Sequence, residues 1–133
     1  MPVPSFRSVP YLPDRKKPED MSMPAITALS DRYHVCPQLD PSDVADIAAL
    51  GYAVLVCMRP DDEASGQPRW KQVEAQAHRH GLTFHFIPTR SGAVMPEQVE
   101  RLREVLEQAE GLVLSYCASG NRCTLAWRMA VEA

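Results

Sequence analysis

The stretch Leu-Val-Leu-Ser-Tyr-Cys-Ala-Ser-Gly-Asn-Arg-Cys occupies residues 112–123 and indicates the fold of the chain. Its first five residues are mainly apolar, as expected of a short strand buried in a sheet. A cysteine follows directly, then a turn of small residues that ends in an arginine. Residues 124–130 have the apolar spacing of a helix. A buried strand that turns sharply into a helix is typical of an α/β protein.

The same alternation of strand and helix runs back through the chain. Three further strands are predicted at residues 33–35, 52–58 and 82–87. Three further helices are predicted at residues 41–50, 70–80 and 96–109, each followed or ended by a glycine (Gly51, Gly81 and Gly111). Short connections between them predict one α/β domain, with a mostly parallel central sheet flanked by helices.

Composition limits the classes of function. The 133 residues carry 14 Lys and Arg against 17 Asp and Glu, a formal net charge of −3, so nucleic acid is not an expected partner. The longest apolar run, residues 52–58, is too short to cross a membrane. Four cysteines are too few for a disulfide scaffold, and no signal peptide is recognisable, so a reducing, cytoplasmic location is expected.

The first residues differ from the rest in composition. Five of the 12 prolines fall within the first 20 residues, together with several charged side chains. Such a segment has little to bury, so residues 1–24 are predicted to be a disordered tail and residues 25–133 a catalytic domain. Met21 and Met23 are alternatives to Met1 as the translation start, and the sequence does not decide between them.

Cys117 is the candidate nucleophile because it lies between a buried strand and a helix. Amide groups at a helix N-terminus favour anions, and the same field favours the thiolate over the thiol. Arg122 is the candidate partner for an oxyanion, since its guanidinium offers a planar pair of donors. The predicted anion-binding loop, with amides turned toward the sulfur, consists of Ala118, Ser119, Gly120 and Asn121.

The remaining chemistry-bearing residues favour structural roles. Cys36, Cys57 and Cys123 are interpreted as buried packing residues. His78 and His80 are two residues apart on a predicted helix and face different directions, so they do not form a metal site. No metal and no cofactor is therefore expected.

A resemblance to a known family rests on an ordered set of short motifs. They are Gln38-Leu39 with Pro41 and Asp43, Gly51-Tyr52, Arg59-Pro60-Asp61, Gln67-Pro68, Gly81-Leu82, Ile87-Pro88, Gly92, Pro96-Glu97-Gln98, and the loop from Cys117 to Arg122. Across about residues 30–130 the chain resembles the phosphatase-like domain of beta-lactamase-hydrolase-like proteins, some of which act in sulfide detoxification. The resemblance implies a cysteine-phosphatase-like α/β fold with Cys117 as nucleophile.

Three positions depart from the usual pattern of that family. Tyr116 and Ala118 stand where the family usually has His and Arg, and Cys123 stands where Ser is usual. Without an arginine at position 118 the loop binds an anion less strongly, so a catalytically weak member of the family is one expectation. Arg90, on the loop after the predicted strand at residues 82–87, is a candidate replacement for the missing charge.

Two chemistries use such a cysteine. Cysteine phosphatases resemble one another in placing five residues between Cys and Arg, whereas rhodanese-like sulfurtransferases more often place four, as between Cys117 and Arg122. A phosphatase also needs a general acid, and the loop after residues 82–87 has no carboxylate before Glu97. The main prediction is therefore a sulfurtransferase that forms a persulfide on Cys117. Arg59 and Asp61, on the loop after residues 52–58, are accessory candidates.

Two alternatives remain open. One is a phosphatase that hydrolyses a phosphomonoester through a phosphorylated Cys117. The other is a binding or regulatory module with little catalytic power. The expected ligand of the enzyme is a small oxyanion or a sulfane-sulfur compound, and the sequence does not indicate an oligomeric state.

Overall fold

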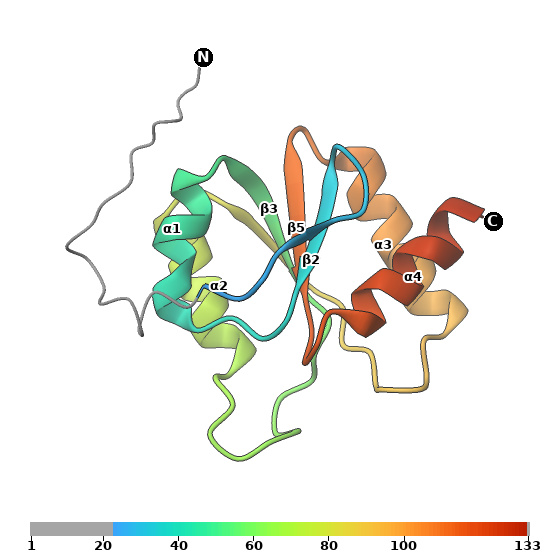
Figure 1. The fold of residues 1–133 in the computed structure, drawn as a ribbon, viewed down its shortest axis with the longest axis horizontal. Helices are drawn as coiled ribbons and strands as arrows, with labels where there is room; N and C mark the ends of the chain where they lie inside the picture. The colour runs from blue at the N-terminus through green and yellow to red at the C-terminus, as the bar shows by residue number, and fades with distance from the viewer. Residues whose placement is uncertain (1–22, 133) are drawn as a thin grey trace.

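The computed structural model describes residues 23–132, which form a five-stranded sheet between two pairs of helices (Figure 1). The sheet has the order β1-β2-β5-β3-β4. Only β1 is antiparallel to its neighbour, and the other pairs are parallel. The strands are β1 (Thr27–Ala28), β2 (Tyr33–Cys36), β3 (Tyr52–Cys57), β4 (Thr83–Phe86) and β5 (Leu112–Tyr116). The predicted α/β domain with a mostly parallel sheet is confirmed.

The helices cover both faces of the sheet and bury two apolar clusters (Figure 1). They are α1 (Val44–Ala49, after the 3-10 turn Pro41–Asp43), α2 (Trp70–Arg79), α3 (Pro96–Gln108) and α4 (Asn121–Glu132). Residues of α1 and α2 pack on one face with Leu55 and Leu114 of the central strands. Residues of α3 and α4 pack on the other face with Val56 and Val113. Because the central strands are apolar on both sides, burial on both faces stabilises this layered arrangement.

Two elements differ from the sequence-based expectation. β1 was not predicted, because two residues are too few to show a period. The last helix begins at Asn121 rather than at residue 124. Its start is fixed by a local polar contact, since the Asn121 amide donates to Ser119 Oγ at 3.2 Å. The earlier start places Arg122 and Cys123 in the first turn of α4.

Parallel register brings the ends of the strands to one edge of the sheet. Cys36 of β2 and Cys57 of β3 both pair with Tyr116 of β5, and Cys57 also pairs with Phe86 of β4. The loops that follow are joined by backbone hydrogen bonds, including Gln38 N to Ala118 O at 3.4 Å. The four loops that follow these strands therefore meet at one edge, which includes the loop of Cys117.

Residues 1–22 and 133 lie outside the described residues, so most of the predicted tail has no structural account here. Within residues 23–132, no helix is long and apolar enough to cross a membrane.

Candidate active site

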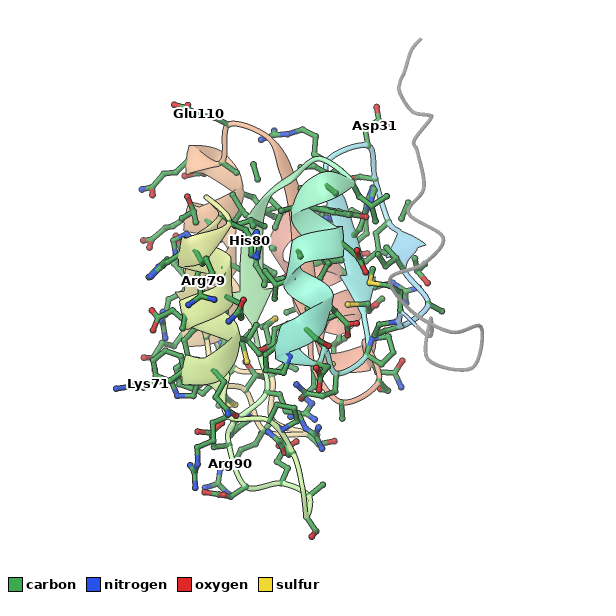
Figure 2. All side chains as sticks on the ribbon, turned by 90° about the vertical axis from the view of Figure 1, so that its left-hand side faces the viewer. Asp31, Lys71, Arg79, His80, Arg90 and Glu110 are labelled. Carbon is green, nitrogen blue, oxygen red and sulfur yellow. The ribbon has the colours of Figure 1, made fainter. Side chains whose placement is uncertain are left out.

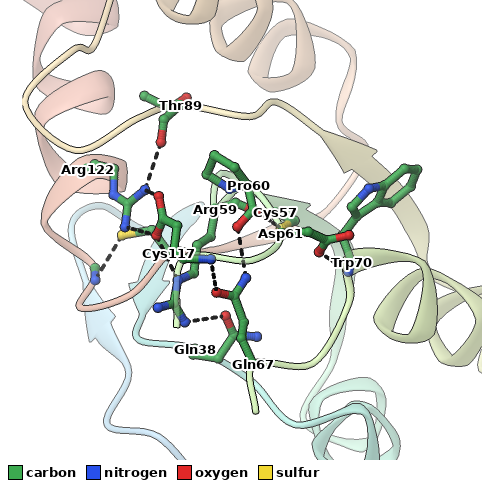
Figure 3. A network of polar contacts seen from close by, with 12 residues as sticks. Gln38, Cys57, Arg59, Pro60, Asp61, Gln67, Trp70, Thr89, Cys117 and Arg122 are labelled. Atoms are coloured by element: carbon green, nitrogen blue, oxygen red, sulfur yellow. Dashed lines mark hydrogen bonds and ion pairs between the residues drawn. The ribbon is translucent and has the colours of Figure 1, made fainter. Parts of the chain in front are cut away.

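Cys117 is the first residue after β5, and its sulfur is held by the turn that follows. The Gly120 amide donates to Sγ of Cys117 at 3.0 Å (Figure 3). Gly120 has a φ of +94°, a conformation that side chains oppose, which explains a glycine at this position. The Cys117 side chain is buried, with 0 % of its surface exposed. The turn after β5 thus holds the Cys117 sulfur in a fixed, buried position.

The surroundings of Cys117 favour its thiolate. The pKa of Cys117 is lowered from 9.0 to about 5, mainly because the thiol of Cys123 donates a hydrogen bond to it. Burial opposes this effect, while the amides of Cys123, Ser119 and Gly120 add to it. At neutral pH the sulfur is therefore an anion, the nucleophilic form of a cysteine.

The cradle around the sulfur differs in part from the predicted anion-binding loop. Ser119 and Gly120 contribute amides, but the Asn121 amide is used by Ser119 Oγ to cap α4. Ala118 is exposed, and its carbonyl accepts from the Gln38 amide. The Asn121 amide instead donates to a side chain of its own turn.

Cys123 is a functional candidate that the sequence analysis assigned to packing alone. It is fully buried, and its own pKa is raised because burial and the neighbouring Cys117 both disfavour a second thiolate. It therefore stays a thiol and acts as a hydrogen-bond donor. The sequence-based prediction began this helix at residue 124. A predicted start at residue 121 would have placed Cys123 in the first turn, beside the Cys117 sulfur, and so would have identified it as a candidate.

Arg122 is anchored at its guanidinium by two partners (Figure 3). Nη1 donates to the Thr89 carbonyl at 2.8 Å and to Oε2 of Glu63 at 2.8 Å, while Nη2 donates to Oε1 of Glu63 at 2.9 Å. This two-pronged pair lowers the pKa of Glu63 and raises that of Arg122. The negative charge of Cys117 further raises the pKa of Arg122, as expected for neighbouring opposite charges.

Arg59, an accessory candidate, lies at the same carboxylate. Its Nε donates to Oε1 of Glu63 at 2.9 Å and its Nη1 donates to Oε1 of Gln38 at 3.0 Å (Figure 3). The sequence does not single out Glu63 from the other acidic residues of this loop. Its role depends on contacts across 59 residues of sequence, which no local pattern reports.

The other two accessory candidates lie elsewhere. The Asp61 carboxylate accepts from the Trp70 amide at 2.9 Å at the start of α2 and pairs with Arg69, so it serves as a helix cap (Figure 3). Arg90 is exposed, near the end of the molecule where the loops meet (Figure 2). Its side chain makes no hydrogen bond or ion pair with residues 23–132. The structure therefore does not place it as a replacement for the missing loop arginine.

The two remaining cysteines have the opposite chemistry to Cys117. Burial raises the pKa of Cys36 to about 12 and that of Cys57 to about 11, so both stay thiols.

Within the described part of the chain, no three His, Cys, Asp or Glu residues come together in a way that would hold a metal ion.

The family of the chain follows from a match over residues 25–133 to the model of the beta-lactamase hydrolase-like protein, phosphatase-like domain. The chain belongs to this phosphatase-like domain family. A beta-lactamase hydrolase-like protein of Xylella fastidiosa (strain Temecula1) is 26 % identical over 105 residues, which is 79 % of this chain and 24 % of that protein. One of Agrobacterium fabrum is 27 % identical over 94 residues, 71 % of this chain and 22 % of that protein. The chain thus spans about a quarter of the length of the curated relatives that it matches.

Solved structures share the phosphatase-like domain. A candidate phosphatase from Neisseria meningitidis matches with a TM-score of 0.72 and 37 % identity, covering 80 % of this chain and 77 % of that chain. A variant of TpbA of P. aeruginosa, solved in complex with phosphotyrosine, matches with a TM-score of 0.59 and 21 % identity, covering 80 % of this chain and 64 % of that one. These similarities confirm the predicted cysteine-phosphatase-like fold. They do not extend to sulfur transfer, which stays a prediction.

Proposed function

We propose that this phosphatase-like domain hydrolyses phosphomonoesters by nucleophilic catalysis at Cys117. The observation that carries the proposal is the Cys117 sulfur itself, held by the Gly120 amide beside a thiol donor, with a lowered pKa and an arginine next to it. The family and the Neisseria candidate phosphatase support the choice of phosphate over other oxyanions.

In the proposed reaction the Cys117 thiolate attacks phosphorus, forming an S–P bond while the bond from phosphorus to the leaving oxygen breaks. Water then attacks the phosphocysteine, the S–P bond breaks, and inorganic phosphate and the thiolate are released. The loop amides and Arg122 would stabilise the charge on the phosphoryl oxygens in both steps. This role requires Arg122 to exchange Glu63 for the substrate.

The preferred substrate depends on whether its leaving oxygen must be protonated as the bond to phosphorus breaks. Asp61, the carboxylate of the β3–α2 loop that the sequence singled out, is not suited to act as a general acid because it caps α2. A leaving oxygen that needs little protonation is therefore favoured. We expect aryl phosphates to react faster than alkyl phosphates.

Sulfur transfer is the second candidate, and the spacing of the loop supports it. Four residues separate Cys117 from Arg122, the spacing that resembles rhodanese-like proteins, and the chemistry needs no general acid. The thiolate would attack the outer sulfur of thiosulfate, sulfite would leave as the S–S bond breaks, and Cys117 would carry a persulfide. A nucleophile such as cyanide then takes the outer sulfur and regenerates the thiolate.

The test compares the wild type with Cys117→Ser on p-nitrophenyl phosphate and on thiosulfate with cyanide. Cys57→Ser is the matched control, since it changes a buried cysteine at the end of the neighbouring strand. We expect phosphate release to fall by about a thousandfold or more in Cys117→Ser and to persist in Cys57→Ser. Thiocyanate formation alone, lost only in Cys117→Ser, would replace the phosphatase by the sulfurtransferase. Activity on neither substrate would favour a binding module.

A further inference from the structure

The carboxylate of Glu63 is bound as a substrate anion would be. It accepts two hydrogen bonds from Arg122 and one from Arg59, all between 2.8 and 2.9 Å. The two arginine side chains are 9 % and 11 % exposed, whereas the Glu63 side chain is 25 % exposed. Two largely buried cations, Arg59 of the β3–α2 loop and Arg122 of the first turn of α4, thus converge on one more exposed carboxylate.

Each arginine keeps a second anchor that does not depend on Glu63. Arg122 donates to the Thr89 carbonyl at 2.8 Å, and Arg59 donates to the Gln38 side chain at 3.0 Å. Both partners are uncharged, so they orient the guanidinium groups without neutralising them. If Glu63 left, these anchors would hold the two guanidinium groups in position, and the charge would rise from +1 for the two arginines with Glu63 to +2 for the two arginines alone.

The nucleophile is closed to solvent in the same conformation. Cys117 has no exposed surface, although Ala118 and Ser119 on the same turn are exposed. A substrate therefore reaches the sulfur only after something moves. Glu63 belongs to the tip of the β3–α2 loop (residues 58–69). Residues 62–66 of this tip are all exposed and have little packing to hold them in place, whereas Arg59 at the start of the loop is half-buried.

We propose that Glu63 occupies the position of the substrate's anionic group, and that Arg59 and Arg122 together form a subsite for a dianion once Glu63 leaves. Phosphate monoesters and thiosulfate both carry two negative charges, so the subsite suits either chemistry. The proposal rests on the proposed function in one respect only, namely that the substrate reaching Cys117 is an anion. It assigns Arg59 as a second anion-binding residue and makes Glu63 an internal competitor of the substrate.

The test measures binding of inorganic phosphate by calorimetry to the wild type, Glu63→Gln and Asp62→Asn. Asp62→Asn is the matched control, because it removes the same charge from the adjacent residue. Asp62 is 78 % exposed and pairs with Arg69, and Asn tolerates its left-handed φ of 68°. We expect Glu63→Gln to bind phosphate about tenfold more tightly or better, as when a binding-competent state is freed. Asp62→Asn should match the wild type.

A second pair of measurements tests the role of Arg59. Adding Arg59→Gln to Glu63→Gln should reverse the gain in phosphate affinity. Alkylation of Cys117 by the anion iodoacetate, relative to neutral iodoacetamide, should rise in Glu63→Gln and not in Asp62→Asn. Thermal unfolding of each variant checks that it is folded. Glu63→Ala is a second variant that removes the carboxylate of Glu63.

The outcomes separate this proposal from the proposed function. Unchanged or weaker phosphate binding in folded Glu63→Gln and Glu63→Ala would overturn the subsite and make Glu63 a support for Arg122, even if turnover at Cys117 is intact. Tighter binding with turnover of neither p-nitrophenyl phosphate nor thiosulfate would uphold the subsite, while the proposed function would fail.

Discussion

Cys57 is the last residue of β3, and Cys117 directly follows the neighbouring strand β5. The pKa values of the two thiols are nevertheless shifted in opposite directions. The residues are close neighbours, since Cys57 pairs with Tyr116. Both are buried, with 1 % and 0 % of their surface exposed. Nevertheless the pKa of Cys57 is raised to about 11, while that of Cys117 is lowered to about 5.

The difference shows that burial alone does not make a reactive cysteine. Burial raises the pKa of both thiols, because the charged form loses its water. The Cys57 sulfur contacts the Tyr116 side chain and the backbone of Arg59, and both contacts lower its pKa, but burial outweighs them. Cys117 instead receives donors from the turn and from Cys123. The balance between hydrogen bonding and burial, rather than burial itself, separates the nucleophile from the packing residue: hydrogen bonds outweigh burial at Cys117, and burial outweighs them at Cys57.

The largest expected effect is the difference in alkylation between these two cysteines. At pH 6 Cys117 is mostly thiolate and Cys57 almost wholly thiol, so iodoacetamide should modify Cys117 about a hundredfold faster or more. Because the folded pKa lies below the ordinary value, the rate at Cys117 should rise through about pH 5 and level off above it. Peptide mapping by mass spectrometry gives both rates.

Protein unfolded in urea is the control, since all four cysteines should then react with one ordinary pH dependence. Equal rates at Cys57 and Cys117 in the folded protein would contradict the comparison.

A smaller effect is expected from the thiol donor. Cys123→Ala removes the largest cause of the lowered pKa, so the alkylation midpoint of Cys117 should move up by about one pH unit or more. Cys123→Ser keeps a donor of similar size and should keep the midpoint near that of the wild type. The same pH series of alkylation rates measures both variants. A midpoint that is unchanged in Cys123→Ala would assign the low pKa to the backbone amides alone.

The smallest expected effect concerns the turn. Gly120→Ala forces a side chain into a φ of +94°, which should lower the free energy of unfolding by about 1–2 kcal/mol. Gly92→Ala is the control, because its φ of +76° carries a similar strain at an exposed position with open space around it. Urea unfolding should report a similar loss for both variants. Only Gly120→Ala should also shift the alkylation midpoint of Cys117, and a shift in Gly92→Ala would argue against a local cause.

Much of the fold was predictable because its elements have strong local patterns. The apolar run of β3 and the strand Leu112–Tyr116 were recognisable from composition and length. The start of α4 was misplaced, because the polar residues Asn121 and Arg122 break the apolar spacing and the cap is a contact between a side chain and an amide. That error hid Cys123, which an N-terminus at Asn121 would have placed beside the sulfur.

The sequence by itself determined the layered α/β sheet and drew attention to Cys117 and Arg122, because hydrophobic periodicity and a strand–turn–helix junction are local properties. Only the tertiary structure decided which groups act on them. It joined Glu63 to Arg122 across the strand ends and placed Asp61 at the start of α2 as a helix cap. The physical reason is that electrostatic and hydrogen-bond partners are chosen by distance in space, and parallel strands bring together loops that are far apart in the chain.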